Sequence, residues 1–239
     1  MAIRSRYNNE KQSRLLRRTA KEIKSYVVQR KVFLTLLAML LSLTTLLYII
    51  ATLYKQSGSF TVSINKYDMS KYGLSLSETK DMANKSSHIN ANIKKHMTNI
   101  AEEWLPENIN SIDGEHNGDN YLAYTFYLEN AGAVDVSYQY AIYISDITHD
   151  LDEAIRVRLY MGDEFETYAK TRSDGLGAEL DSKEFYSSNV VCQDRVDNFK
   201  SGDVQKFTVV VWIEGNDPDC VDWLIGGELK LEMMMQIVH

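Results

Sequence analysis

The sequence predicts a mainly β protein: an antiparallel β-sandwich of jelly-roll type with one or two inserted helices, preceded by a single N-terminal transmembrane helix. Three observations support this fold class. The stretch 32–54 carries no charge and is long enough to span a bilayer as a helix. Several later segments alternate apolar and polar residues with a period of two, and Asn-Gly or Gly-Asp pairs separate them. The composition, 44% hydrophobic and 25% charged, excludes a chain disordered throughout.

The N-terminal segment 1–31 is strongly basic. Ten Lys/Arg against two acidic residues give it a net charge of +8, and since the whole chain carries -7, the remainder carries -15. Basic residues beside a first membrane helix keep that side in the cytoplasm. We therefore interpret the tail as an orientation signal rather than a nucleic-acid or anionic-lipid site, and we expect no nucleic-acid partner.

Three interpretations of the uncharged stretch compete: a retained anchor, a cleaved signal peptide and a buried core helix. A core helix should show a polar face, and signal peptides have apolar regions of about 7–15 residues. We expect a retained anchor, with cleavage near Ser57–Ser59 as the alternative. The predicted organisation of a single-pass plasma-membrane protein is then as follows: cytoplasmic tail 1–31, bilayer-spanning helix 32–54, hinge 55–59 and extracellular β-sandwich 60–239.

The predicted strands differ in how their apolar residues are arranged. Alternation places one apolar face on the strands 60–65, 134–145, 155–160 and 229–237. Apolar residues on both faces predict central strands at 121–128 and 207–214, and weaker signals fall at 166–170 and 185–192.

Two helices are predicted within the β-domain. Apolar residues at three- or four-residue spacing predict a helix from Ile89 to Trp104, which Pro106 would end. A capping-box pattern from Ser75 to Glu78 predicts a second, shorter helix with Met82 facing inward.

No cofactor is expected from the sequence, and calcium is the one ligand for which it offers candidate residues. The run 113–120 places oxygen donors at alternate positions as in an EF-hand loop, but Tyr124 occupies the position of the bidentate Glu. The predicted ligands are Asp113, Glu115, Asn117 and Asp119. A second acidic loop, 214–219, is a further candidate, and an ordinary polar turn is the alternative for both.

Catalytic motifs are absent from the sequence. The histidines lack the spacing of a zinc-protease helix, and the two S-x-x-K matches have no S-D-N or K-T-G partner. We therefore expect a non-enzymatic protein. The only two cysteines, Cys192 and Cys220, are expected to form a disulfide, with paired free thiols as the alternative. Closing this loop of about 28 residues would stabilise the domain by about 3 kcal/mol.

Three segments carry a resemblance to a known group of proteins. The run from Phe207 to Cys220, which contains W-I-E-G-N-D-P-D-C, is its most specific part, and the segments 226–233 and 124–132 extend it. These segments resemble the camelysin and TasA group, exported jelly-roll proteins of Gram-positive bacteria with roles in surface or biofilm fibres. The resemblance implies a jelly-roll fold and a surface role, but no residue here matches a recognisable zinc motif.

The expected function is that of a membrane-anchored cell-surface module for structure, interaction or assembly, through a protein partner or self-association. One alternative is a camelysin-like metallopeptidase with ligands such as His116 together with Glu115 or Asp119. The other is a signal-cleaved, secreted fibre subunit. Strand 60–65 either closes its own sheet or adds to a sheet edge of the next molecule.

Overall fold

The computed structural model describes residues 24–50, 60–92 and 96–238. The chain divides into two compact units, Met1–Lys55 and Gln56–His239. In the first unit a helix runs from Lys24 to Ile50, and it is long and apolar enough to cross a membrane. A signal sequence would meet the same criteria. The predicted span 32–54 coincides with this helix as far as Ile50, while its last residues and the hinge 55–59 lie outside the described residues.

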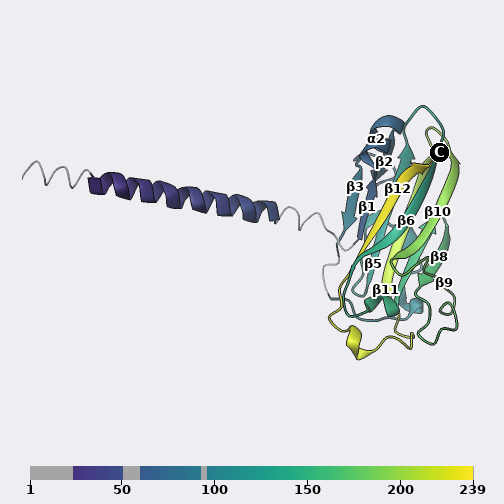
Figure 1. The fold of residues 1–239 in the computed structure, drawn as a ribbon. Coiled ribbons are helices and arrows are strands. Elements are labelled where there is room, and N and C mark those ends of the chain that lie inside the picture. The colour runs from purple at the N-terminus through teal and green to yellow at the C-terminus, as the bar shows by residue number, and fades with distance from the viewer. Residues whose placement is uncertain (1–23, 51–59, 93–95, 239) are drawn as a thin grey trace, which may run out of the picture. The chain divides into compact units, whose positions relative to one another are not determined.

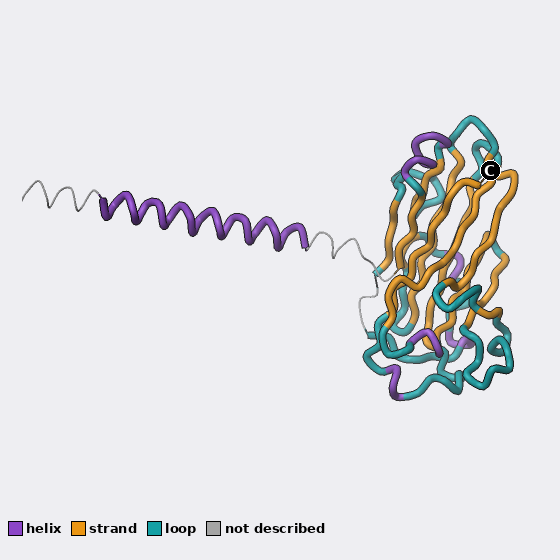
Figure 2. Tube along the Cα trace, viewed as in Figure 1, coloured by secondary structure: helices purple, strands orange, loops and turns teal. Residues whose placement is uncertain are grey.

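The second unit is a sandwich of two packed sheets, in agreement with the predicted fold class (Figures 1 and 2). The first sheet has the order β10 (Val190–Phe199), β6 (Val136–Ile147), β12 (Leu229–Val238), β1 (Phe60–Ile64) and β3 (His88–Ala91). The second has the order β2 (Leu74–Ser77), β5 (Tyr121–Asn130), β11 (Val204–Ile213), β7 (Ile155–Met161), β8 (Glu164–Ala169) and β9 (Lys183–Glu184), and β4 (Gly114–Glu115) also pairs with β5.

Both sheets are mixed, so the antiparallel arrangement predicted for the sandwich has two exceptions. Strand β1 runs parallel to β12, with Phe60 opposite Leu231, and β8 runs parallel to β9. Every other pairing of these strands is antiparallel. The period of two in the sequence identifies the buried face of a strand but carries no information about the direction of its neighbour.

The predicted helix from Ile89 to Trp104 is wrong. Ile89 lies on strand β3, and a single 3-10 turn, η1 (Glu102–Trp104), follows later. Ile89 is buried in the core, whereas Trp104 is 78% exposed, so the spaced apolar residues do not share one face. Residues 93–95, within the predicted helix, lie outside the described residues.

The shorter predicted helix is also wrong, because Leu74–Ser77 forms strand β2. The α-helix of this unit is instead α2 (Lys66–Tyr72), where the Asn65 side chain accepts a hydrogen bond from the Tyr67 amide and Gly73 ends the helix at a φ of 76°. Met82 is buried, as predicted, but it directly follows a turn and is not part of a helix. The remaining short elements are 3-10 turns: η2 (Ile109–Ser111), η3 (Leu151–Glu153) and η4 (Asp222–Leu224).

A series of aromatic rings forms the centre of the core between the two sheets. Phe60 of the first sheet packs edge-on against Tyr124 of the second at 6.1 Å between ring centroids. Phe207 stacks on Phe126 at 5.4 Å and meets Tyr140 of the first sheet edge-on at 5.9 Å. These contacts join the sheets through large buried side chains, whose removal from water is the main source of stability.

The outer face of the second sheet carries a smaller apolar cluster. Its members are Ile109, Ala123, Tyr160, Val210 and Trp212. Partly buried side chains from the segment before β4, including Ile100 and Leu105, pack against this cluster. Strands β5 and β11 are therefore apolar on both faces, which confirms their prediction as central strands.

Gly132 allows two backbone segments to approach closely where the chain turns between β5 and β6. A Cβ atom added to Gly132 would lie 2.0 Å from the Tyr72 carbonyl oxygen. We expect Gly132→Ala to destabilise the domain by about 3 kcal/mol, at the upper end of overpacking effects. Gly162→Ala is the control: its φ is +66° but nothing lies within 4 Å, so a cost of about 1 kcal/mol is expected. Chemical denaturation measures both, and equal costs would contradict this account.

Candidate functional site

One end of the sandwich gathers several connections of the chain around a cavity. The segment that follows β8, the turn η3 and the link between β11 and β12 all lie at this end, because β7 begins where the antiparallel strands β8 and β11 end. The cavity has a volume of about 560 Å³. Its lining consists of Asp150, Glu153, Lys170, Thr171, Ser173, Phe185, Ser187, Ser188, Asp219, Val221, Trp223 and Leu224.

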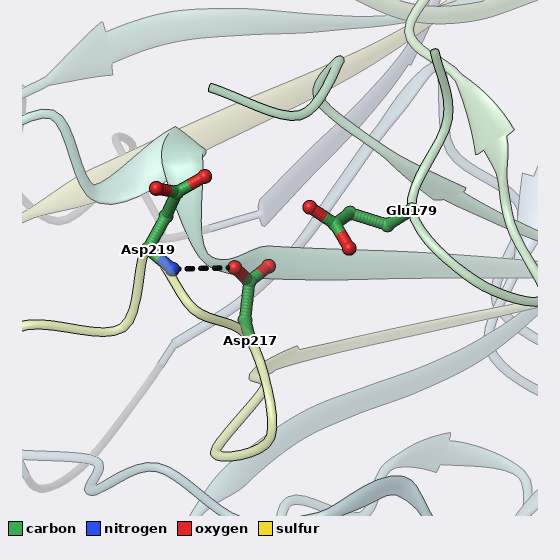
Figure 3. A group of neighbouring side chains, drawn as sticks. All are labelled: Glu179, Asp217 and Asp219. Carbon is green, nitrogen blue, oxygen red and sulfur yellow. Dashed lines mark hydrogen bonds between the residues drawn. The ribbon is translucent and has the colours of Figure 1, made fainter. Parts of the chain in front are cut away.

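Three carboxylates converge beside this cavity: Glu179, Asp217 and Asp219 (Figure 3). One oxygen of each lies within 4.8 Å of the others, a spacing at which they could hold a metal ion. The Asp217 Oδ1 atom accepts a hydrogen bond of 2.8 Å from the Asp219 amide, which fixes the loop between them. Asp219 also lines the cavity, so the cluster and the cavity share one side chain.

A buried arginine on β7 supplies positive charge to this cluster. The Nη1 atom of Arg156 lies 2.7 Å from Asp217 Oδ2, and its Nη2 atom lies 3.7 Å from Glu179 Oε2. The shorter contact is an ion pair without hydrogen-bond geometry, because Asp217 Oδ2 has no hydrogen-bond partner in the part of the chain that the structure describes. The side chains of Arg156 and Asp217 are almost fully buried, where an uncompensated charge is costly.

Glu179 is a buried carboxylate with a raised pKa. Its burial, followed by repulsion from Asp217, raises its pKa above the ordinary value, and attraction to Arg156 only partly opposes this. A raised pKa in the folded state means that the protonated carboxyl favours folding and that this contribution is lost as the pH rises through the folded-state pKa.

We expect Glu179→Gln to stabilise the domain at pH 7, because the amide keeps the shape of the carboxyl without its charge. The advantage should shrink as the pH falls toward the pKa of an unfolded glutamate, about 4.3, since wild-type Glu179 then becomes protonated as well. Thermal melts of both proteins between pH 4 and pH 8 measure this difference. A difference that stays constant across this range, or a less stable variant at pH 7, would contradict the assignment.

Three of the predicted calcium ligands, Asp113, Glu115 and Asn117, accept hydrogen bonds from other residues of the chain. The Tyr127 hydroxyl donates to Asp113 Oδ1 at 2.6 Å, the Asn92 amide donates to Glu115 Oε2, and the Ala123 amide donates to Asn117 Oδ1. Asp119 is an exposed residue of the turn before β5. The three hydrogen bonds connect this segment to different neighbours. None of the predicted calcium ligands belongs to the cluster of Glu179, Asp217 and Asp219.

The second predicted acidic loop supplies two members of that group, Asp217 and Asp219. Sequence reasoning missed Glu179, which lies almost forty residues earlier in an irregular segment. It also missed Arg156, because the alternation in β7 placed that residue on a face assumed to be exposed. Only the packing of three separate segments brings these side chains together.

His116 was the imidazole proposed for a zinc site. Its Nδ1 atom lies 2.9 Å from the Gly114 carbonyl oxygen, and its Nε2 atom lies 2.8 Å from the Ile109 carbonyl oxygen. Both ring nitrogens therefore face backbone acceptors that hold the segment before β5. As folded, this imidazole fastens a loop and does not point toward a group of metal ligands.

The two cysteines are free thiols in the structure, so the predicted disulfide is not formed. Cys192 is buried on β10 in the core, and this burial raises the pKa of its thiol to about 12. The Cys220 sulfur accepts a hydrogen bond from Asn99 Nδ2 at 3.4 Å in the loop after β11. The two thiols have different neighbours, which their sequence positions did not indicate.

Comparison with known proteins gives no family assignment. No family model matches the chain, and no curated protein matches it. The N-terminal domain of PorA is 10% identical, with 52% of this chain and 81% of that chain covered, at a TM-score of 0.22. A β-glucosidase from Kluyveromyces marxianus in complex with glucose is 14% identical, with 74% and 17% covered, at a TM-score of 0.24. Similarities this low support no conclusion about fold or function.

Proposed function

We propose that the protein is a membrane-anchored cell-surface protein whose β-sandwich acts as a structural, interaction or assembly module. In this proposal the helix Lys24–Ile50 is retained in the plasma membrane. The basic tail stays in the cytoplasm, and the unit Gln56–His239 lies outside the cell.

The exposure of the helix Lys24–Ile50 is the observation that carries this proposal. Every described residue of this helix is exposed, including the large apolar residues from Val32 to Ile50. Soluble proteins rarely expose so long and continuous an apolar surface. A lipid bilayer would cover it on all sides, and at about 1.5 Å per residue its 27 residues exceed the roughly 30 Å of a hydrocarbon core.

Charge supports the orientation and the extracellular placement. The tail 1–31 is basic and the remainder is acidic, as expected when positive residues stay in the cytoplasm. The resemblance of the segments around Trp212 to camelysin and TasA proteins supports a role at the cell surface.

A signal-cleaved, secreted subunit is the second candidate, since the helix lies near the N-terminus and the small residues Ser57–Ser59 follow it. Cell fractionation followed by N-terminal sequencing separates the two. We expect the intact chain in the membrane fraction, extractable only with detergent. A soluble product in the medium that begins near Phe60 would favour the secreted subunit and contradict the anchor.

A further inference from the structure

The cavity at the end of the sandwich combines aromatic and acidic side chains. Trp223, in η4, is 67% exposed, and Phe185 approaches from the segment between β9 and β10. The acidic residues Asp150, Glu153 and Asp219 line the same cavity. An aromatic face beside carboxylates in a concave site resembles the lining of a ligand pocket, which pairs apolar surface with a few polar groups.

The charge of the lining is negative. Lys170 is its basic residue, and its Nζ atom lies 2.6 Å from Glu153 Oε1 and 2.7 Å from Asp152 Oδ2. Burial lowers the pKa of this lysine, but its hydrogen bonds to Asp152 and Glu153 outweigh that effect and the pKa is raised. The lysine is therefore charged and already paired with acidic side chains. Asp150 and Asp219 add further negative charge to the lining, and the Asp219 carboxylate accepts a hydrogen bond of 3.3 Å from the Ser173 amide.

We propose that this cavity binds an organic cation, an ammonium or guanidinium group, between the Trp223 ring and the carboxylate of Asp219. A cation over an indole face gains about 0.5–2 kcal/mol, and the carboxylate adds an ion pair in a partly enclosed site. The cation can come from a free amine or from a basic side chain of a protein partner. The inference rests on the proposed interaction role where the partner is a protein.

Other ligand classes fit the lining less well. An anion would meet more carboxylates than cations. A divalent metal ion would need the cluster of Glu179, Asp217 and Asp219, where the Arg156 guanidinium already lies 2.7 Å from Asp217. An uncharged ligand would gain nothing from the negative charge of the cavity.

The test is a binding titration of the full-length protein in lipid nanodiscs, monitored by calorimetry. The probes are cadaverine, N-acetyl-lysine methylamide and its uncharged analogue N-acetyl-norleucine methylamide. We expect both amines to bind and the norleucine compound not to bind. Tighter binding of a lysine-containing peptide than of cadaverine would point to a protein side chain, and the reverse would point to a free amine. Equal binding of the lysine and norleucine compounds would overturn the proposal.

Variants locate the site. Trp223→Ala and Asp219→Asn are each expected to weaken amine binding about 2- to 30-fold, the range that a cation–π contact provides. Trp223→Phe should retain most of the affinity, since it keeps an aromatic face. Trp104→Ala is the matched control, because Trp104 is 78% exposed and does not line the cavity.

Two outcomes would refute the assignment. One is unchanged amine binding in Trp223→Ala, because the proposal places the cation against the Trp223 ring. The other is displacement of the amine by millimolar Ca²⁺ in a manner abolished by Glu179→Gln, which would assign the site to a metal ion. The titration measures only amine binding to the cavity. A result that overturns the binding proposal therefore does not affect the membrane-anchor proposal.

Discussion

Deletion of residues 60–64 is expected to leave the unit Gln56–His239 unfolded. Strand β1 pairs with β12 on one side and with β3 on the other, so its loss removes backbone hydrogen bonds from both neighbours. Phe60, Val62 and Ile64 are buried, and each contributes about 1.5–3 kcal/mol. The sum is comparable to the whole net stability of a domain, about 5–15 kcal/mol.

Circular dichroism and the cooperativity of thermal unfolding measure this result. Ser63→Asp is the control, because Ser63 lies on the same strand with its side chain only half buried. The measurement also tests whether β1 adds to a neighbouring molecule. A truncated domain that stays folded and no longer oligomerises would support exchange of the strand and contradict the expectation of unfolding.

Replacing Phe207 with alanine is expected to destabilise the domain by about 3–5 kcal/mol, the range for a large aromatic side chain removed from a packed core. Phe207 is fully buried on β11 and contacts Phe126 of its own sheet and Tyr140 of the opposite sheet. The alanine would leave a cavity where the two sheets meet, and rigid strands on both sides limit its collapse.

Urea denaturation of wild type and variant gives the difference in unfolding free energy. Tyr186→Ala is the matched control, since Tyr186 is 66% exposed and its loss should change stability by no more than about 0.5 kcal/mol. A cost below about 1.5 kcal/mol for Phe207→Ala would show that this ring is not central to the core.

The sequence was informative where a pattern is local. Alternating residues located β6, β7 and β12 to within about two residues, because the faces of a strand repeat every second residue whatever lies beside it. The spaced apolar residues from Ile89 onward also fit a helical pattern, but the backbone there pairs with β1. The pairing of β3 with the distant strand β1 makes this segment a strand, and no local sequence pattern indicates such a pairing.

In the candidate site, too, the sequence indicated the residues of a local pattern but not those brought in from distant segments. Asp217 and Asp219 stand out in the sequence as parts of an acidic loop, whereas Glu179 and Arg156 do not. Arg156 lies in an alternating strand, where a charged residue indicates an exposed face, yet here its side chain is buried against carboxylates from two other segments. The cavity beside them has walls from four separate stretches of the chain, so only the fold defines it.

Protease accessibility on intact cells tests the central claim most directly. The protein carries one tag at its N-terminus and a different tag after His239, and cells are treated with protease before and after permeabilisation. The membrane-anchored account predicts that the C-terminal tag is removed from intact cells and that the N-terminal tag is lost only after permeabilisation. A C-terminal tag that resists the protease on intact cells, while the N-terminal tag is cut, would contradict it.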